Sequence, residues 1–443
     1  MTEQATERKV AEAQTAALEL AKLDDGERSA ALHAMADAIE AEEERILDAN
    51  ETDVTEGEEL LAAGEYSQAL VDRLKLSPSK LGDIAAMVRS VAEQDDPLGR
   101  TLTARRLDDG LELYKVGVPI GVIGTVFESR PDALVQIAAL SLKSGNAVIL
   151  KGGSEASHSN RVLYEIIREA TADMPDGWAQ LIEAREDVNT MLDMDDAIDL
   201  LMPRGSSEFV SYIQDNTQIP VLGHTEGVCH VFVDRDADLE MATNVAFDAK
   251  VQYPAVCNAV ETLLVHEDVA ADYLPEMVTR YEDAGVELRG DAATRDVVDV
   301  DAATDKDWST EYGDLELSIK VVDSLDAAID HVNTHGSKHT ESILTEDADR
   351  ASTFMRSIDA ASVFHNASTR FADGYRYGLG AEVGISTGKI HARGPVGLEG
   401  LTTYKYYLEG DGQLVATYSG ENAKPYLHEE FEGEWIPGHL AAE

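Results

Sequence analysis

One of the two cysteines, Cys257, is placed where a catalytic nucleophile could be held. It lies in a Tyr-Pro-Ala-Val-Cys-Asn-Ala segment that follows an amphipathic stretch (238–250) and precedes an apolar run (260–265). A thiolate held in an exposed turn can form a thioester with an acyl substrate. The alternative is a buried cysteine that packs as a small hydrophobe. We assign that structural role to Cys229, which leads directly into the strand-like run 230–234.

Two loops between a strand-like and a helix-like segment carry glycines and a cation. The first is Lys151, Gly152, Gly153 and Ser154, and the second contains Arg204, Gly205 and Ser206. Glycines allow a ligand to approach the backbone, and a helix N-terminus offers free N–H groups to an anion. Two such loops predict a dinucleotide pocket, and their two cations favour NADP(H). Because no G-x-G-x-x-G fingerprint is present, an ordinary Rossmann dehydrogenase is disfavoured.

The stretch 374–400 is dense in glycine and indicates close approach of a ligand to the backbone. Its available polar side chains are Ser386, Thr387, Lys389, His391 and Arg393. Guanidinium groups suit carboxylate and phosphate alike, so we expect Arg130 and Arg393 to help hold substrate anions. The alternative is that either arginine pairs with one of the many acidic residues.

Three histidines, His331, His335 and His339, are spaced four residues apart and raise the question of a metal site. Gly336 and Ser337 interrupt the helix that would align them, and no cysteine or regularly spaced carboxylate completes a ligand set. We therefore expect no metal site, and histidines that face solvent or form local hydrogen bonds.

The charge of the chain is strongly negative. Its 443 residues include 85 acidic and 36 basic residues, and the formal net charge is −49 at pH 7. Because the acidic residues are spread along the chain, the charge excludes a general nucleic-acid surface and is interpreted as adaptation to high salt. No apolar run approaches the roughly 18 residues of a membrane span, and the N-terminus has no apolar signal core, so we expect a cytoplasmic protein without membrane contact.

Helical periodicity dominates residues 1–95, and two hairpins are expected beyond them. Residues 102–107 and 111–116 alternate around Asp-Asp-Gly, and 402–408 and 413–418 alternate around Glu-Gly-Asp-Gly. These hairpins could pair with each other or with another subunit.

Between the hairpins, strand-like and helix-like segments alternate. They are 118–126, 132–142, 147–150, 154–170, 197–202 and 207–213, and then 238–250, 262–265, 270–284, 319–322, 325–332 and 342–344. This alternation predicts two doubly wound parallel-sheet domains joined around residue 235, with ligands at the carboxyl ends of the strands.

Several stretches together resemble one known family. They are 118–124, 128–131, 143–153, 203–205, 253–259, 335–340, 366–374, 378–387 and 391–395. The chain is similar over most of its length to the gamma-glutamyl phosphate reductases, a branch of the aldehyde dehydrogenase superfamily. The resemblance implies an aldehyde dehydrogenase-like α/β fold. It implies a cofactor-binding domain (1–235, interrupted by a hairpin at 99–115), a catalytic domain (236–401) and a C-terminal oligomerisation segment (402–443) of a homo-oligomer.

The resemblance also implies a reaction, the NADPH-dependent reduction of L-glutamyl 5-phosphate to L-glutamate 5-semialdehyde and phosphate through a thioester on Cys257. The oxyanion would be held by the Cys257 N–H and by Ser129 or Arg130. Glu311 would hold the nicotinamide ribose. Glutamate 5-kinase, which forms the substrate, is implied as a partner. The substrate-binding set would be Arg130, Asn258, Lys389, His391 and Arg393.

The chain departs from the family pattern at three places. Gly205-Ser206 replaces two glycines, Asp132 replaces an asparagine, and the segment 223–227 stands where oxidising aldehyde dehydrogenases carry Glu-Leu-Gly-Gly. Loss of the water-activating glutamate fits an enzyme that must not hydrolyse its thioester. An aldehyde dehydrogenase that oxidises another aldehyde, or a silent scaffold, remains the alternative.

Overall fold

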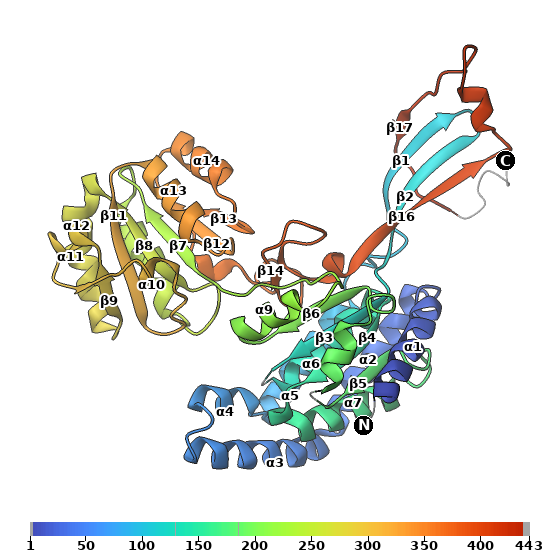
Figure 1. Ribbon diagram of the computed structural model, residues 1–443, viewed down its shortest axis with the longest axis horizontal. Coiled ribbons are helices and arrows are strands. Elements are labelled where there is room, and N and C mark those ends of the chain that lie inside the picture. The colour runs from blue at the N-terminus through green and yellow to red at the C-terminus, as the bar shows by residue number, and fades with distance from the viewer. Residues whose placement is uncertain (1–2, 129, 185, 437–443) are drawn as a thin grey trace.

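The computed structural model describes residues 3–128, 130–184 and 186–436. Two α/β bodies and a projecting antiparallel arm make up the molecule (Figure 1). The arm leaves the first body near the point where the chain connects to β3, and the second body lies on the opposite side.

The described part of the N-terminal region is helical up to Ala92, as expected. Its helices are α1 (Glu3–Leu20), α2 (Asp25–Ala41), α3 (Glu43–Ala62), α4 (Gln68–Leu74) and α5 (Pro78–Ala92). Local signals set their starts: the Asp24 carboxylate and the Glu27 side chain form a capping box at α2. Ser77 caps α5 with Pro78 at its first position.

The first body contains a four-stranded parallel sheet in the order β5-β4-β3-β6. Its strands and later helices are β3 (Val122–Phe127), α6 (Pro131–Lys143), β4 (Ala147–Gly152), η1 (Ser154–Ala156), α7 (Ser157–Ala170), β5 (Ala179–Ile182), α8 (Glu186–Leu192), β6 (Leu200–Arg204) and α9 (Ser207–Asp215). The sequence reasoning did not identify the four-residue β5. Since β3 lies between β4 and β6, the loops after these three strands meet at one edge of the sheet.

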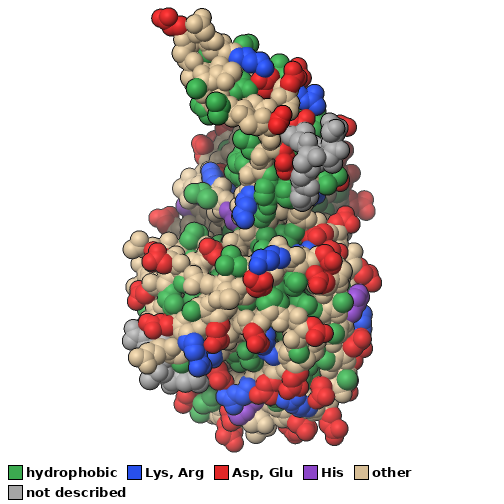
Figure 2. Space-filling view, turned by 90° about the vertical axis from the view of Figure 1, so that its right-hand side faces the viewer, with side chains coloured by type: hydrophobic (Ala, Val, Ile, Leu, Met, Phe, Trp, Pro, Cys, Tyr) green, Lys and Arg blue, Asp and Glu red, His purple; other side chains and the backbone are tan. Residues whose placement is uncertain are grey.

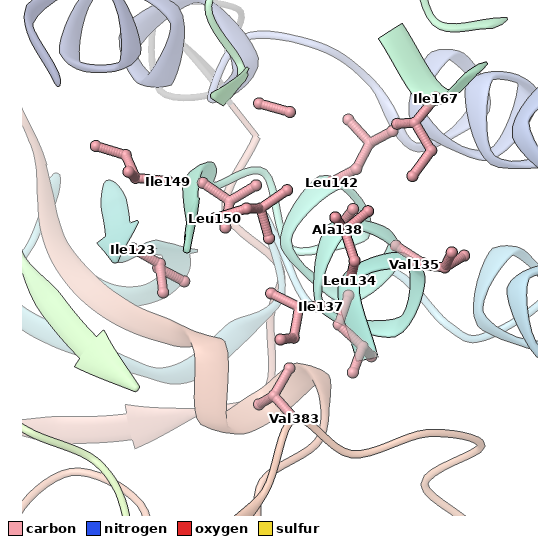
Figure 3. Packing of buried hydrophobic residues seen from close by; sticks show 14 of the residues in the cluster. Ile123, Leu134, Val135, Ile137, Ala138, Leu142, Ile149, Leu150, Ile167 and Val383 are labelled. Carbon is pink, nitrogen blue, oxygen red and sulfur yellow. The ribbon is translucent and has the colours of Figure 1, made fainter. Parts of the chain in front are cut away.

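The core of the first body lies between this sheet and its helices. Ile137 of α6 packs in one buried cluster with Ile123, Ile149 and Leu150 of the sheet. Val383, from much later in the chain, belongs to the same cluster (Figure 3). The glycine-rich stretch is therefore anchored on the first body although it follows the second.

The second body contains a seven-stranded sheet in the order β10-β9-β11-β8-β7-β12-β13, with every pair parallel. Its elements are β7 (Cys229–Val233), α10 (Leu239–Val251), β8 (Val260–His266), α11 (Glu267–Asp283), β9 (Glu287–Gly290), α12 (Ala292–Arg295), β10 (Asp301–Ala302), η2 (Asp307–Ser309), β11 (Glu316–Val322), α13 (Leu325–His335), β12 (Thr340–Leu344), α14 (Ala348–Ser357) and β13 (Ser362–His365). The chain changes sheet ahead of β7, so the seven-stranded sheet begins before residue 235.

Short elements connect the second body to the arm. They are η3 (Thr369–Phe371), β14 (Ile385–Ser386), β15 (Gly394–Pro395) and η4 (Leu398–Leu401). The β14 and β15 strands form a two-stranded antiparallel pair.

The arm is a four-stranded sheet in the order β16-β2-β1-β17. Its elements are β1 (Thr101–Asp108), β2 (Leu111–Pro119), β16 (Thr402–Gly410), η5 (Val415–Tyr418) and β17 (Glu429–Phe431). The first predicted hairpin is confirmed, and Gly110 supplies the positive φ, 64°, that its turn requires.

The second predicted hairpin is wrong. β16 pairs along the whole of β2, from Thr402 opposite Pro119 to Gly410 opposite Leu111, which satisfies its backbone groups. The Gln413 side chain then donates to the carbonyl oxygens of Asp109 and Gly110 at 3.2 and 3.1 Å. The chain is thereby tied to the β1–β2 turn and does not return along β16.

Acidic side chains dominate the charged groups on the face shown in Figure 2, with fewer Lys and Arg among them. No helix in the described part of the chain is long and apolar enough to cross a membrane.

Candidate active site

Cys257 lies in the turn between α10 and β8, at the carboxyl end of α10. The Asp238 carboxylate starts this helix by accepting from the Met241 N–H, and the turn after it leaves Cys257 half-buried. The next residue, Asn258, is buried and donates from Nδ2 to the Ala372 carbonyl oxygen at 2.8 Å. This hydrogen bond holds the cysteine turn against the segment that leads into the glycine-rich stretch.

Gly227 packs against the backbone of the cysteine turn. A Cβ at this position would lie 2.1 Å from the carbonyl oxygen of Cys257 and 2.5 Å from its Cα, which no side chain can occupy. The Gly227 N–H donates to Glu311 Oε2 at 2.9 Å. Glu311, expected near the nicotinamide ribose, is therefore linked to the cysteine turn through Gly227.

Cys229 has the structural role expected of it. It is fully buried in β7, and its Sγ donates to the Cys257 carbonyl oxygen at 3.2 Å. Burial raises the pKa of the Cys229 thiol well above its ordinary value, so this cysteine stays protonated and unreactive.

Two histidines flank the Cys257 thiol. One ring nitrogen each of His224 and His339 and the Cys257 Sγ all lie within 4.8 Å of one another. The two rings meet edge to face, with centroids 5.2 Å apart. Sequence reasoning missed this arrangement because His224 precedes β7, His339 precedes β12, and only the sheet brings these ends to the cysteine turn.

Charged groups surround the thiol as well. Arg204 donates to Gln136 Oε1 at 3.1 Å and lies within electrostatic range of Cys257 and Glu382. Burial, and then the charge of Arg130, lowers the pKa of Arg204. Burial raises the pKa of Glu382, although this carboxylate accepts from the Gly374 N–H at 2.8 Å. Arg370, buried and hydrogen-bonded to Gln252, also lies within electrostatic range of Cys257.

The residues at the strand ends of the first sheet fit a dinucleotide. Lys151 is buried at the end of β4, and its Nζ donates to the Gly152 carbonyl oxygen at 2.5 Å. The first turn of α7 is already satisfied, since the Asp53 carboxylate accepts from the N–H groups of His158 and Ser159. Hydrogen bonding therefore leaves the N-terminus of α7 less suited to a diphosphate than that of α9.

At α9 the N–H groups of residues 207–209 donate to no group in the described part of the chain. The backbone just ahead of them is fixed, because the Ser206 N–H donates to Glu128 Oε2 at 3.0 Å. Gly205 lies against the same carboxylate: a Cβ at this position would be 2.6 Å from Glu128 Oε2. Free N–H groups at a helix N-terminus are the feature that a diphosphate requires.

The cations of the glycine-rich stretch have an acidic partner. Asp359 binds Lys389 at 2.8 Å, Arg393 at 3.0 Å and Lys338 at 3.6 Å. The hydrogen bonds from Lys389 and Arg393 lower the pKa of Asp359 to about 2. His391 is exposed, with a left-handed φ of 73°, and belongs to none of these pairs.

The three evenly spaced histidines do not face solvent, which corrects one of the two alternatives. His331 and His339 are buried and His335 is half-buried. Each has a hydrogen-bond partner within the second body. His331 pairs with Lys320 at 3.1 Å, His335 with Ser309 at 3.0 Å and His339 with Thr340 at 2.9 Å. Burial lowers the pKa of His331 to about 2, so this ring is neutral.

Of the two candidates for the second oxyanion donor, Ser129 lies outside the described residues. Arg130 is half-buried at the start of α6, between the loops that carry Lys151 and Arg204 in the order of the sheet. It forms no ion pair with a residue that the structure describes.

Comparisons with known proteins agree with this architecture. Residues 1–303 match the model of the aldehyde dehydrogenase family. The chain is 77% identical over 439 residues to gamma-glutamyl phosphate reductase of Natronomonas pharaonis, covering 99% of this chain and 100% of the relative. It is 53% identical to the enzyme of the same name from Methanococcoides burtonii, covering 97% of both chains.

Among solved structures, gamma-glutamyl phosphate reductase of Thermotoga maritima superposes with a TM-score of 0.89 at 41% identity, covering 92% of this chain and 99% of that one. A glyceraldehyde-3-phosphate dehydrogenase of Methanocaldococcus jannaschii, solved with NADP, shares the fold at 16% identity and a TM-score of 0.66, with 93% and 95% covered. The chain therefore belongs to the aldehyde dehydrogenase family and, within it, to the gamma-glutamyl phosphate reductases.

Proposed function

We propose that this chain reduces L-glutamyl 5-phosphate to L-glutamate 5-semialdehyde with NADPH, releasing phosphate, as a step of proline biosynthesis from glutamate. The observation that carries the proposal is the contrast between its two thiols. Cys257 is half-buried in a turn among histidines and arginines, whereas Cys229 is fully buried. The first has the exposure and the electropositive surroundings of a nucleophile, and the second has neither.

Cys257 attacks as the thiolate. Its sulfur forms a bond to the acyl carbon, the bond from that carbon to the phosphate oxygen breaks, and inorganic phosphate leaves. The oxyanion that forms in between needs N–H donors. The N–H of Cys257 donates to no described residue, so it is available for this purpose. Asn258 Nδ2 is committed to Ala372, so Asn258 contributes by fixing the turn.

NADPH, when bound, supplies the hydride that converts the thioester to a thiohemiacetal, which then releases the aldehyde. We assign its diphosphate to the N-terminus of α9, next to Arg204, Gly205 and Ser206. We assign its adenosine ribose to Lys151 and the turn 152–154. We assign the nicotinamide ribose to Glu311, whose carboxylate accepts from the Gly227 N–H beside the cysteine turn. Lys151, on the side of the adenosine ribose, favours the phosphorylated cofactor over NADH.

We infer that the described residues of the site do not hydrolyse the thioester. The segment 223–227 places the imidazole of His224 beside the thiol. Of the nearby acids, Glu382 accepts from the Gly374 N–H at 2.8 Å and Glu311 accepts from the Gly227 N–H at 2.9 Å. Both carboxylates are therefore already engaged, and we infer that the acyl group passes between phosphate and hydride.

We propose that Arg130 and Arg393 hold the carboxylate and phosphate of the substrate, with Lys389 and His391 nearby. The ion pairs at Asp359 position Lys389 and Arg393 before substrate arrives. Arg204 and Arg370 add positive charge on the side of the thiol.

The test is oxidation of the semialdehyde in the reverse direction with NADP+, with and without phosphate. We expect steady turnover only with phosphate. Turnover that is independent of phosphate would identify an aldehyde dehydrogenase that hydrolyses its thioester, and absence of turnover under both conditions would identify a catalytically silent scaffold.

We also propose that the arm joins copies of this chain in a homo-oligomer. β16 forms an edge of the arm sheet and exposes Tyr404, Tyr406 and Leu408. An aromatic edge strand suits pairing with a second copy. The acidic surface fits a cytoplasm of high salt content.

A further inference from the structure

We propose that His224, Cys257 and His339 bind a thiophilic divalent cation such as Zn²⁺, and that the bound ion inactivates the enzyme by occupying its nucleophile. The inhibitory part of this inference rests on the proposed function of Cys257. The binding part rests on geometry alone, because one ligand atom from each residue lies within 4.8 Å of the other two. Thiolate and imidazole are the ligands that Zn²⁺ prefers.

His224 is prepared as a ligand by its hydrogen bond. Its Nδ1 lies 2.9 Å from the carbonyl oxygen of Ile385, which can only accept, so Nδ1 carries the proton. Nε2 therefore keeps its lone pair. Histidines that bind metals commonly donate their second ring N–H to a backbone carbonyl in this way, which fixes the tautomer and the ring orientation.

His339 has a buried ring nitrogen without a hydrogen-bond partner among the described residues. Its side chain is completely buried, and its Nε2 has no hydrogen-bond partner among the described residues. Its Nδ1 is occupied by Thr340 Oγ1 at 2.9 Å, with Cys229 Sγ at 3.7 Å. A buried nitrogen without a partner is costly unless it binds something, and here it belongs to the ring that flanks the thiol.

Coordination requires only small movements. Ligands of a tetrahedral Zn²⁺ with ordinary Zn–S and Zn–N bonds lie about 3.3 to 3.6 Å from one another. The observed limit of 4.8 Å can be closed by side-chain rotation at Cys257 and His224, which are both half-buried. Three protein ligands leave the fourth position to water.

Binding would release the thiol proton to solvent and leave sulfur bound to the metal. A sulfur that shares its electron pair with Zn²⁺ does not attack the acyl phosphate. The site therefore makes activity sensitive to free zinc, and a chelator restores it. No electron transfer or covalent change is involved.

The experiment uses Co²⁺ as a spectroscopic substitute for Zn²⁺ on the reduced, full-length enzyme in high-salt buffer. We expect a thiolate-to-cobalt charge-transfer band that saturates at one ion per chain and is displaced by Zn²⁺. Cys257→Ser should remove the band, whereas Cys229→Ser, which changes only the buried thiol, should keep it. His224→Ala and His339→Ala should each weaken Co²⁺ binding at least tenfold. Thr340→Val, which removes the hydrogen bond to His339 Nδ1, should weaken Co²⁺ binding by about 10- to 100-fold.

The outcomes separate this inference from the proposed function. If wild-type enzyme turns over with phosphate but gives no charge-transfer band, or if His224→Ala and His339→Ala bind Co²⁺ with the affinity of wild type, the metal site is wrong and the function stands. If the band forms as described but no phosphate-dependent turnover is found, the metal site stands and the function is wrong. Zn²⁺ that binds without slowing turnover would overturn the inhibitory role.

Discussion

Gly227→Ala tests whether the position of the cysteine turn limits the reaction. The new Cβ would lie 2.1 Å from the carbonyl oxygen of Cys257 and 2.5 Å from its Cα. Both atoms belong to the backbone, so no side-chain rotation can relieve the contact. To restore ordinary van der Waals separation the turn must retreat by roughly 1 Å.

The magnitude follows from this displacement. A misplacement of about 1 Å at a reacting atom costs about 100-fold in rate, or about 2.7 kcal/mol in the barrier. We therefore expect kcat for phosphate-dependent semialdehyde oxidation to fall about 100-fold. The affinity for NADP+ should change little, because the proposed cofactor contacts lie on the first sheet.

Gly223→Ala is the matched control, in the same connecting segment. Its Cβ would meet nothing nearer than Pro203 at 3.5 Å, an ordinary contact. Both variants are assayed for steady-state kinetics, thermal unfolding and the alkylation rate of Cys257. A folded Gly227→Ala enzyme with wild-type kcat would refute the reasoning, as would an equal loss in Gly223→Ala.

Four further predictions follow from individual residues and from the surface. Cys257→Ala should abolish turnover while leaving NADPH binding intact, and Cys229→Ala should keep most activity; the reverse ranking would refute the nucleophile assignment. Lys151→Ala should raise the dissociation constant for NADPH about tenfold with a smaller effect on kcat, measured by fluorescence titration; an unchanged constant would remove Lys151 from the pocket. Asp359→Asn should lower the unfolding temperature near pH 7. Because the pKa of Asp359 is depressed to about 2, the difference in unfolding temperature from wild type should shrink as pH falls below about 4. A difference that stays constant with pH would show that the ion pairs of Asp359 with Lys389 and Arg393 do not stabilise the fold. Activity and folding should both decline at low ionic strength, since a net charge of −49 is then unscreened; full stability without salt would contradict the halophilic interpretation.

Much of the architecture could be predicted because its signals are local. The capping residue Asp24, the glycine turn at Gly110 and the apolar strands of the first sheet each determine their element from neighbouring residues. The segment around Cys257 could be found in the same way, as a turn between a helix and a buried strand.

What could not be predicted depends on contacts between distant residues. The choice of β2 as the partner of β16 depends on which edge is free, a property of the assembled arm. His224 and His339 reach the thiol only because β7 and β12 are neighbours in the sheet. The pairing of Lys389 and Arg393 with Asp359 likewise depends on where the end of α14 lies in the fold.

The central claim is that Cys257 forms a thioester which phosphate, and not water, resolves. The most direct test mixes the enzyme with semialdehyde and NADP+ in the absence of phosphate and follows NADPH formation in the first turnover, with mass spectrometry of the quenched protein. We expect a burst of one NADPH per active site, a glutamyl adduct on Cys257, and steady turnover once phosphate is added. Continuous turnover without phosphate, or an adduct on any other residue, would contradict the account.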